Sequence, residues 1–230
     1  MNVRVRAVIF DFNGVLVDDE HVHFELFRDV LAAEGIELTE RAYHAEYLGF
    51  DDRGAFEAAL QGSGRSFDRA KIEDLIARKA KLYVEVAEAG LKLFPGAAES
   101  VLLAAERGPV AICSGALRAE VEFGLRKLAV RELVSAIVAS EDTTRCKPDP
   151  EGYVSTLKAL QTRRPDLTAS ECLVVEDSLA GVEAGAAAGM FVVGVCHTYQ
   201  HDELLQAGAR VVLPTLAAFP SWANFSDMGG

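Results

Sequence analysis

The chain has 230 residues, half of them hydrophobic, which is enough for one large domain or two smaller ones with a buried core. It carries 23 Lys and Arg residues against 35 Asp and Glu residues, a formal net charge of −12. This charge argues against a nucleic-acid-binding surface, which needs a basic face, although a local basic pocket for an anion remains open.

The first predicted element is a strand over residues 5–10, a continuously apolar run that leads into Asp11 and the turn residue Gly14. Continuous apolarity is typical of a strand that is buried on both faces. Two residues after Asp11 stands Asn13, where a catalyst that uses paired carboxylates would carry Asp. The stretch FDFNGVLV is therefore an active site, an altered active site or only a turn.

Residues 18–90 show helical periodicity and no good strand pattern. We predict helices over 23–35, where apolar residues share one face and Gly35 ends the helix, over 53–61 and over 70–89. This block is too long for an ordinary crossover between strands. We interpret it as a helical cap, which predicts a cap domain at 17–92 and a core domain made of 1–16 and 93–230.

Helix and strand patterns alternate along the rest of the chain. Helices are predicted at 99–107, 116–128 and 151–161, and strands at 109–114, 135–140, 172–177, 190–195 and 210–214. The alternation predicts an α/β fold with a Rossmann-like, doubly wound parallel sheet as its core and the inserted α-helical cap domain. Segment 180–190 lacks the G-x-G-x-x-G order of a nucleotide loop, so we predict a small-residue helix that lies close on the sheet and ends at Gly189.

The four cysteines are far apart and form no C-x-x-C pair, which argues against a zinc site. Cys113, Cys172 and Cys196 stand in apolar runs and are predicted to be buried thiols. A reducing cytoplasm is the simplest compartment for them. The N-terminus has no secretion-signal pattern, and no apolar run approaches the length of a membrane span.

Chemically useful residues follow four of the predicted strands: Asp11, Ser114, Gly115, Lys147, Glu176 and Asp177. Ligands of open parallel sheets bind at the carboxyl ends of the strands, so these residues would converge on one crevice. Each has a simpler explanation when taken alone, as a helix N-cap, a solvated lysine or an acidic pair beside a helix N-terminus. Together they indicate a site.

The convergent groups suit phosphoryl transfer. Asp11 could attack phosphorus and form an aspartyl phosphate, while Lys147 neutralises the phosphate charge. Ser114 and the backbone amides near Gly115, at the start of a helix, could cradle phosphate oxygens.

Oxygen ligands in the same group suit Mg²⁺. Asp11 and Asp177 would bind the ion, and waters and phosphate would complete its octahedron. Glu176 would be a direct or water-mediated partner. Positioning and charge stabilisation are what phosphoryl transfer mainly requires.

The sequence resembles the haloacid dehalogenase-like superfamily of hydrolases, in particular its β-phosphoglucomutase-like phosphatases with a helical cap. The motifs that carry the resemblance are DFNGVLVDDE, ICSGA, CKPDP and VVEDSLAGVEAGAAAGM, in the family's order. The resemblance implies a nucleophile, two phosphate binders and a metal-binding acidic pair, which are in turn Asp11, Ser114 with Lys147, and Glu176 with Asp177. It also implies that the backbone carbonyl at position 13 is a metal ligand.

Asn13 departs from the family pattern, in which an Asp side chain at this position is the general acid/base. An amide can neither protonate a leaving alkoxide nor deprotonate the water that attacks the phospho-enzyme. Such catalysis contributes about 10²–10⁴-fold in rate, or roughly 3–5 kcal/mol. Three explanations stay open: a native enzyme with a displaced acid/base or an undemanding leaving group, a weakened binding protein, or a substitution introduced to trap a complex.

Replacement acids would come from the cap or its linker, and the candidates are Glu20, His21 and His23. Mutase-like relatives carry a His at the spacing of His23 from the nucleophile, whereas Glu20 and His21 are also explained as solvated linker residues. Arg53 and Lys79 fall where relatives place cap residues that face the site. A basic residue there could bind a second phosphate, a sugar hydroxyl or a carboxylate, and an ordinary solvated helix face is the alternative.

These observations predict a cytoplasmic, Mg²⁺-dependent phosphatase that acts on a small phosphorylated metabolite, with a sugar phosphate among the candidates. The alternatives are a phosphosugar mutase and a catalytically weakened or trapped phosphometabolite-binding protein. A dehalogenase is less favoured, because Lys147 and the acidic pair favour phosphate and Mg²⁺. We expect no nucleic-acid or membrane partner, and a monomer or a small homo-oligomer.

Overall fold

The computed structural model describes residues 5–43, 47 and 50–225. The chain divides into two compact units, one formed by Met1–Asp18 with Lys92–Gly230 and the other by Asp19–Leu91. We call them the core unit and the helical unit. In the part of the chain that the structure describes, no helix has both the length and the apolar character needed to cross a membrane.

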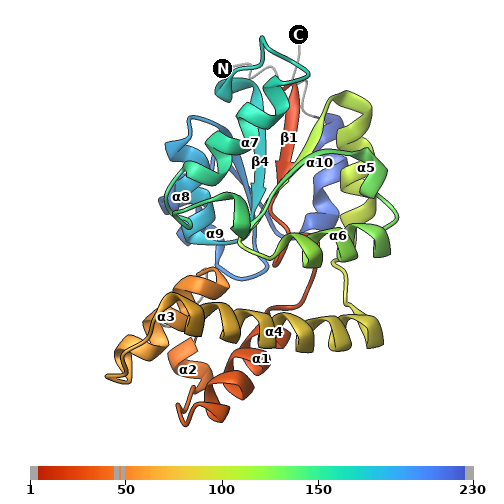
Figure 1. The fold of residues 1–230 in the computed structure, drawn as a ribbon. Coiled ribbons are helices and arrows are strands. Elements are labelled where there is room, and N and C mark those ends of the chain that lie inside the picture. Colours follow the sequence, from red (N-terminus) through yellow and green to blue (C-terminus); the bar gives the residue numbers. More distant parts are fainter. Residues whose placement is uncertain (1–4, 44–46, 48–49, 226–230) are drawn as a thin grey trace. The chain divides into compact units, whose positions relative to one another are not determined.

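Within the described residues, the core unit is built on six parallel strands in the order β3-β2-β1-β4-β5-β6 (Figure 1). The strands are β1 (Ala7–Phe10), β2 (Val110–Cys113), β3 (Val134–Val138), β4 (Cys172–Glu176), β5 (Phe191–Val195) and β6 (Val211–Leu213). All six predicted strands are present, with ends that differ from the predictions by at most two residues. The chain runs outward from β1 to β3 and then returns to β4, so the predicted doubly wound, Rossmann-like sheet is confirmed.

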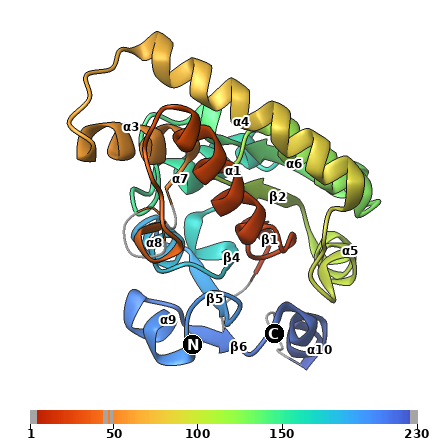
Figure 2. The ribbon, with the colours of Figure 1, turned by 90° about the horizontal axis from the view of Figure 1, so that it is seen from below.

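Helices cover both faces of this sheet (Figures 1 and 2). Those of the core unit are α5 (Ala97–Arg107), α6 (Arg118–Lys127), α7 (Glu151–Gln161), α8 (Leu179–Ala187), α9 (His201–Ala207) and α10 (Phe219–Phe225). Helices α7, α8 and α9 lie on one face, and α5 and α10 lie on the other. Because β1, β2 and β4 are buried along their whole length, their sequences are continuously apolar.

Helix α8 lies close on the sheet because its glycines carry no side chain. A Cβ on Gly185 would stand 2.9 Å from a methyl of Val192 in β5. Gly189 follows the helix with φ +77°, a left-handed conformation that favours glycine. The segment 180–190 is therefore structural, as its small residues predict.

All four cysteines are free, and Cys113 and Cys172 are buried as predicted. The prediction is wrong for Cys196, which is only half-buried. Cys196 directly follows β5, where the chain leaves the covered part of the sheet.

The helical unit contains α1 (Glu20–Ala33), α2 (Glu40–Ala42), α3 (Asp52–Gly62) and α4 (Arg69–Gly90), and its described residues form no strand. Asp51 and Asp68 cap α3 and α4, because their side chains accept hydrogen bonds from backbone N–H groups of the first turns. Apolar side chains of α1, α3 and α4 form one buried cluster that includes Phe27, Phe56 and Leu75.

The chain passes between the two units after Asp18 and before Lys92. On the core side these two points are adjacent, because the Asp18 N–H donates to the Lys92 carbonyl at 2.9 Å. Val17 and Leu93 form an antiparallel bridge beside this bond, and the Phe94 N–H donates to the Leu16 carbonyl at 3.1 Å. The helical unit is thus inserted at one place in the core unit.

Candidate active site

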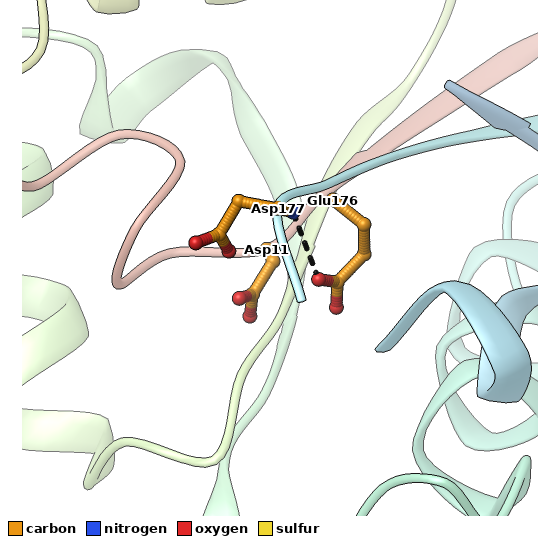
Figure 3. A group of neighbouring side chains, drawn as sticks. All are labelled: Asp11, Glu176 and Asp177. Carbon is orange, nitrogen blue, oxygen red and sulfur yellow. Dashed lines mark hydrogen bonds between the residues drawn. The ribbon is translucent and has the colours of Figure 1, made fainter. Parts of the chain in front are cut away.

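The carboxyl ends of neighbouring strands bring together the side chains that the sequence singles out. Asp11 follows β1, Ser114 follows β2, and Glu176 with Asp177 stands at the end of β4. Asp11, Glu176 and Asp177 are buried, and each offers an oxygen within 4.8 Å of the oxygens of the other two (Figure 3). The parallel register of β1 with β2 and β4 causes this convergence, because parallel strands end at the same edge of the sheet.

Lys147 lies in the loop between β3 and α7 and contacts two of these carboxylates. Its Nζ is 2.8 Å from Oδ1 of Asp11 and 2.5 Å from Oε1 of Glu176. Burial opposes the ammonium, but the facing carboxylates of Asp11 and Glu176 outweigh it and hold the pKa of Lys147 above its usual value. Burial also raises the pKa of the Asp11 carboxyl to about 7, against the attraction of Lys147. The lysine is therefore a permanent positive charge beside Asp11.

Glu176 is fully buried, and both of its carboxylate oxygens accept hydrogen bonds. Oε1 accepts from Lys147 and, at 2.7 Å, from the hydroxyl of Tyr153 in α7. Oε2 accepts from the N–H groups of Asp177 and Ser178, at 3.1 and 3.2 Å, and from the Ser178 hydroxyl at 3.1 Å. This carboxylate thus orients the Lys147 ammonium toward Asp11. Sequence reasoning missed Tyr153, whose signal is a hydroxyl-bearing aromatic residue within the apolar pattern of a helix.

The turn after Asp11 depends on a glycine. Gly14 has φ +75°, and a Cβ at this position would stand 2.3 Å from Oδ2 of Asp177. Its N–H donates to the Val17 carbonyl at 2.8 Å. A side chain at position 14 would therefore both strain the turn and displace the Asp177 carboxylate. This close approach shows that FDFNGVLV forms part of the carboxylate cluster and is more than a turn.

Asn13 lies beside Ser114, whose hydroxyl donates to Oδ1 of Asn13 at 3.3 Å. The Ser114 hydroxyl also accepts the Ala116 N–H at 3.1 Å, and Gly115 is the exposed turn residue between them. The predicted helix 116–128 is present as α6, which begins two residues later, at Arg118. The turn at residues 114–117 is held by the serine hydroxyl.

Two further residues reach the cluster from the loop after β5, and sequence reasoning missed both. Nδ1 of His197 lies 2.7 Å from the Gly14 carbonyl oxygen, and the Thr198 hydroxyl donates to Oδ2 of Asp177. Inspecting the end of the fifth predicted strand, as for the first four, would have found them.

Two of the five candidates in the helical unit, His23 and Lys79, meet inside that unit. Nζ of Lys79 is 2.8 Å from Nδ1 of His23 and 2.5 Å from Oδ1 of Asp52. The other ring nitrogen of His23 lies 3.4 Å from Oδ2 of Asp19, which also accepts the Tyr83 hydroxyl at 2.6 Å. Lys79 is fully buried, so the explanation of a solvated helix face is wrong for this residue. These five residues, all buried except the half-buried Asp52, form a polar network that joins α1, α3 and α4.

The remaining candidates of the helical unit lie outside this network. Arg53 is exposed in the first turn of α3, and His21 is exposed on α1. Glu20 is half-buried in α1, and its Oε1 accepts the Tyr43 hydroxyl at 2.5 Å. The explanation of Glu20 as a solvated linker residue is therefore wrong.

The carboxylate cluster of the core unit could hold a cation. Its three buried carboxylates face one ammonium, which leaves two negative charges in excess when all are ionised. Buried charge of one sign is costly unless a partner compensates it. Carboxylate oxygens at this spacing fit a hard divalent cation such as Mg²⁺.

Comparison with known proteins identifies the family of the chain. The family model described as haloacid dehalogenase-like hydrolase matches residues 5–189. The protein CbbY of Rhodobacter capsulatus is 32% identical, over 94% of this chain and 96% of its own length. A phosphorylated carbohydrates phosphatase of Thermotoga maritima is 30% identical, over 89% of this chain and 92% of its own length.

A solved structure also shares the fold. The crystal structure of β-phosphoglucomutase from Clostridium difficile superposes with a TM-score of 0.83, covering 97% of each chain at 20% identity. At this identity the likeness shows the fold alone. The match of the family model over most of the chain and the identity with CbbY show more. The chain therefore belongs to the haloacid dehalogenase-like hydrolase family, and it is an enzyme of that family.

Proposed function

We propose that the protein is a Mg²⁺-dependent phosphatase that hydrolyses a small phosphorylated metabolite through an aspartyl phosphate on Asp11. The observation that carries the proposal is the buried Asp11 carboxylate, held beside the Lys147 ammonium within a group of carboxylates that can bind a cation. The name of the Thermotoga maritima relative favours a phosphorylated carbohydrate as the substrate. We further propose that the protein works in the cytoplasm.

The reaction has two steps on Asp11. A carboxylate oxygen of Asp11 attacks phosphorus, the ester bond breaks, and the leaving oxygen takes a proton. Water then attacks the aspartyl phosphate, which releases inorganic phosphate and restores the carboxylate. Lys147 and Ser114 bind the phosphate oxygens and offset their charge throughout. When bound by Asp11, Asp177 and the Asn13 carbonyl, Mg²⁺ would supply further charge neutralisation.

Asn13 limits the rate of both steps in this proposal. Its amide can donate a hydrogen bond to a phosphate or leaving oxygen, but it cannot exchange a proton with either. We do not assign the missing acid/base to His23, because Lys79 and Asp19 already engage its two ring nitrogens within the helical unit. Solvent water would then protonate the leaving oxygen in the first step and accept the proton of the attacking water in the second, at a cost in rate.

The test is a panel of small phosphate esters assayed with Mg²⁺ on the wild-type protein, Asp11→Ala and Asn13→Asp. We expect no activity for Asp11→Ala and a kcat for Asn13→Asp that is about 10²–10⁴-fold above wild type, with KM little changed. Free phosphate, rather than an isomeric sugar phosphate, should be the product. Two results would overturn the proposal. One is retained activity in Asp11→Ala, and the other is the absence of turnover in both the wild-type protein and Asn13→Asp.

One control concerns the chemical identity of residue 13. Asn13 precedes Gly14, whose lack of a side chain favours attack of its amide nitrogen on the Asn13 side chain and loss of ammonia. Such deamidation would convert part of the wild-type protein into the acid. Peptide mass spectrometry of each preparation must therefore show that residue 13 of the wild-type protein is Asn before rates are compared.

A further inference from the structure

Thr198 contacts the proposed metal ligand Asp177, and His197 contacts Gly14, the neighbour of the proposed ligand Asn13; neither takes part in the chemistry above. They are consecutive residues in the loop that follows β5. His197 meets the Gly14 carbonyl at 2.7 Å, while Thr198 donates to Oδ2 of Asp177. One loop therefore holds the turn of Asn13 and the carboxylate of Asp177.

The contacts of His197 define both its tautomer and the position of its ring. The Leu216 N–H donates to Nε2 at 3.0 Å, so Nε2 is an acceptor and the proton is on Nδ1. Nδ1–H then donates to the Gly14 carbonyl. The ring also stacks on Phe94, with centroids 3.8 Å apart and planes inclined by 13°. Burial lowers the pKa of His197, which favours this neutral form.

The Asn13 carbonyl belongs to the same peptide group as the Gly14 N–H, and His197 holds the next peptide group through the Gly14 carbonyl. Both peptide groups of Gly14 are held, the N–H by the Val17 carbonyl and the carbonyl by His197. The Asn13 carbonyl and the Gly14 N–H belong to one planar trans peptide group and point in opposite directions. The hydrogen bond of this N–H to Val17 therefore also sets the direction of the Asn13 carbonyl. Gly14 also lies directly against the Asp177 carboxylate. A shift of this glycine would therefore move the Asn13 carbonyl relative to Asp177.

We infer that His197 and Thr198 are positioning residues, which hold the Asn13 carbonyl and the Asp177 carboxylate at the separation that a divalent cation requires. The inference rests on the proposed function, because that function makes these two groups the ligands. Groups that orient metal ligands through hydrogen bonds typically change metal affinity by 10–100-fold when they are removed. Both residues act on one geometry, so their effects should not be additive.

The experiment measures the affinity of the full-length protein for Mg²⁺ alone by isothermal titration calorimetry, without substrate. His197→Phe keeps an aromatic ring beside Phe94 but loses the hydrogen bonds of the imidazole to Gly14, Thr215 and Leu216. Thr198→Val keeps its shape but loses the hydroxyl. We expect each to raise the Kd about 10-fold or more, and the double variant to raise it by less than the product of the two. His197→Asn, whose amide nitrogen can replace Nδ1, should stay within about threefold of wild type.

The controls separate positioning from folding. His201→Phe, on the exposed start of α9, should leave the Kd unchanged. Thermal unfolding identifies any variant that fails to fold, and Thr198→Val tests the inference independently because Thr198 is exposed. A wild-type Kd in Thr198→Val or in folded His197→Phe overturns the inference. So does an equal loss in His197→Asn and His197→Phe, because the ring and not the hydrogen bond would then be responsible.

The same measurements distinguish the inference from the proposed function. Ester hydrolysis that requires Asp11, together with a Mg²⁺ affinity that is unchanged in these variants, overturns the positioning role alone. A weakened affinity in the variants, with no ester hydrolysis by wild type or Asn13→Asp, overturns the phosphatase and supports the positioning role.

Discussion

Glycines make room for two of the carboxylates in the candidate active site. Gly14 admits the Asp177 carboxylate, and Gly181 in the first turns of α8 admits that of Glu176. A Cβ on Gly181 would stand 1.8 Å from Oε1 of Glu176, which is the oxygen that contacts Lys147. The small residues after the acidic pair therefore serve the site as well as the packing of α8 on the sheet.

Gly181→Ala should displace the Glu176 carboxylate and with it the Lys147 ammonium. We expect the free energy of unfolding to fall by roughly 1–3 kcal/mol, because a methyl group is forced into occupied space. Ester hydrolysis should fall as well. Chemical denaturation measures the first effect. Gly62→Ala is the matched control, since nothing lies within 4 Å of its added Cβ, and equal stability of the two variants would contradict the prediction.

Asn13 is the residue on which the proton transfers of the proposed mechanism depend most. The Ser114 hydroxyl donates to the oxygen of its side-chain amide at 3.3 Å. A carboxylate oxygen of Asp at this position could accept the same hydrogen bond, so we expect the turn to keep its conformation in Asn13→Asp. The Asn13→Asp comparison thus tests the chemistry of one side chain within an unchanged backbone.

At the scale of elements, a polar network joins three helices of the helical unit. Lys79 in α4 meets His23 in α1 and Asp52 in α3, and Asp19 and Tyr83 extend the chain of contacts. Buried charges of this kind contribute little net stability as a pair, but removal of one partner is costly. The network therefore specifies how α1, α3 and α4 pack against one another.

Lys79→Met should destabilise the helical unit by about 3–5 kcal/mol, because it leaves the Asp52 carboxylate without its buried cation. Addition of Asp52→Asn should recover part of this loss, since no uncompensated charge remains. Lys81→Met, on the exposed face of the same helix, is the control and should stay within about 0.5 kcal/mol of wild type. Urea denaturation followed by circular dichroism measures all three. Equal losses for Lys79→Met and Lys81→Met would show that the network is dispensable.

At the scale of the whole molecule, one insertion separates the two units. The chain leaves the core unit after Asp18 and returns at Lys92, and a backbone hydrogen bond of 2.9 Å joins these residues. Adjacent ends of this kind are typical of inserted domains, because the host fold can form without the insert. The core unit also contains Asp11, Lys147 and the acidic pair.

Replacement of residues 19–91 by a short glycine-rich linker should leave a core that unfolds cooperatively and still binds Mg²⁺. Because the resemblance makes Arg53 and Lys79 of the helical unit candidates for substrate binding, we expect the shortened protein to lose its preference among phosphate esters. Circular dichroism, calorimetry with Mg²⁺ and the ester panel measure the three properties. A core that fails to unfold cooperatively would contradict the prediction of independence, and an unchanged ester preference would contradict the role of the helical unit.

The fold of the core was largely predictable from the chain. Strands buried on both faces require continuously apolar runs, and these runs stand at all six strand positions with helical patterns between them. The strand-end rule then placed Asp11, Ser114, Lys147, Glu176 and Asp177 together before any coordinates. The short helices α9 and α10 were not predicted, because seven residues give too few turns for a clear helical period of apolar residues.

The sequence by itself determined the strands, the helical insertion and the residues that could carry phosphoryl chemistry, because these depend on local patterns and on the common edge of a parallel sheet. Only the tertiary structure decided the partners of those residues. It paired Glu176 with Tyr153, buried Lys79 against His23 and Asp52, and brought His197 to Gly14. Such contacts join residues that are far apart in the chain, and their geometry depends on side-chain packing that no local pattern records.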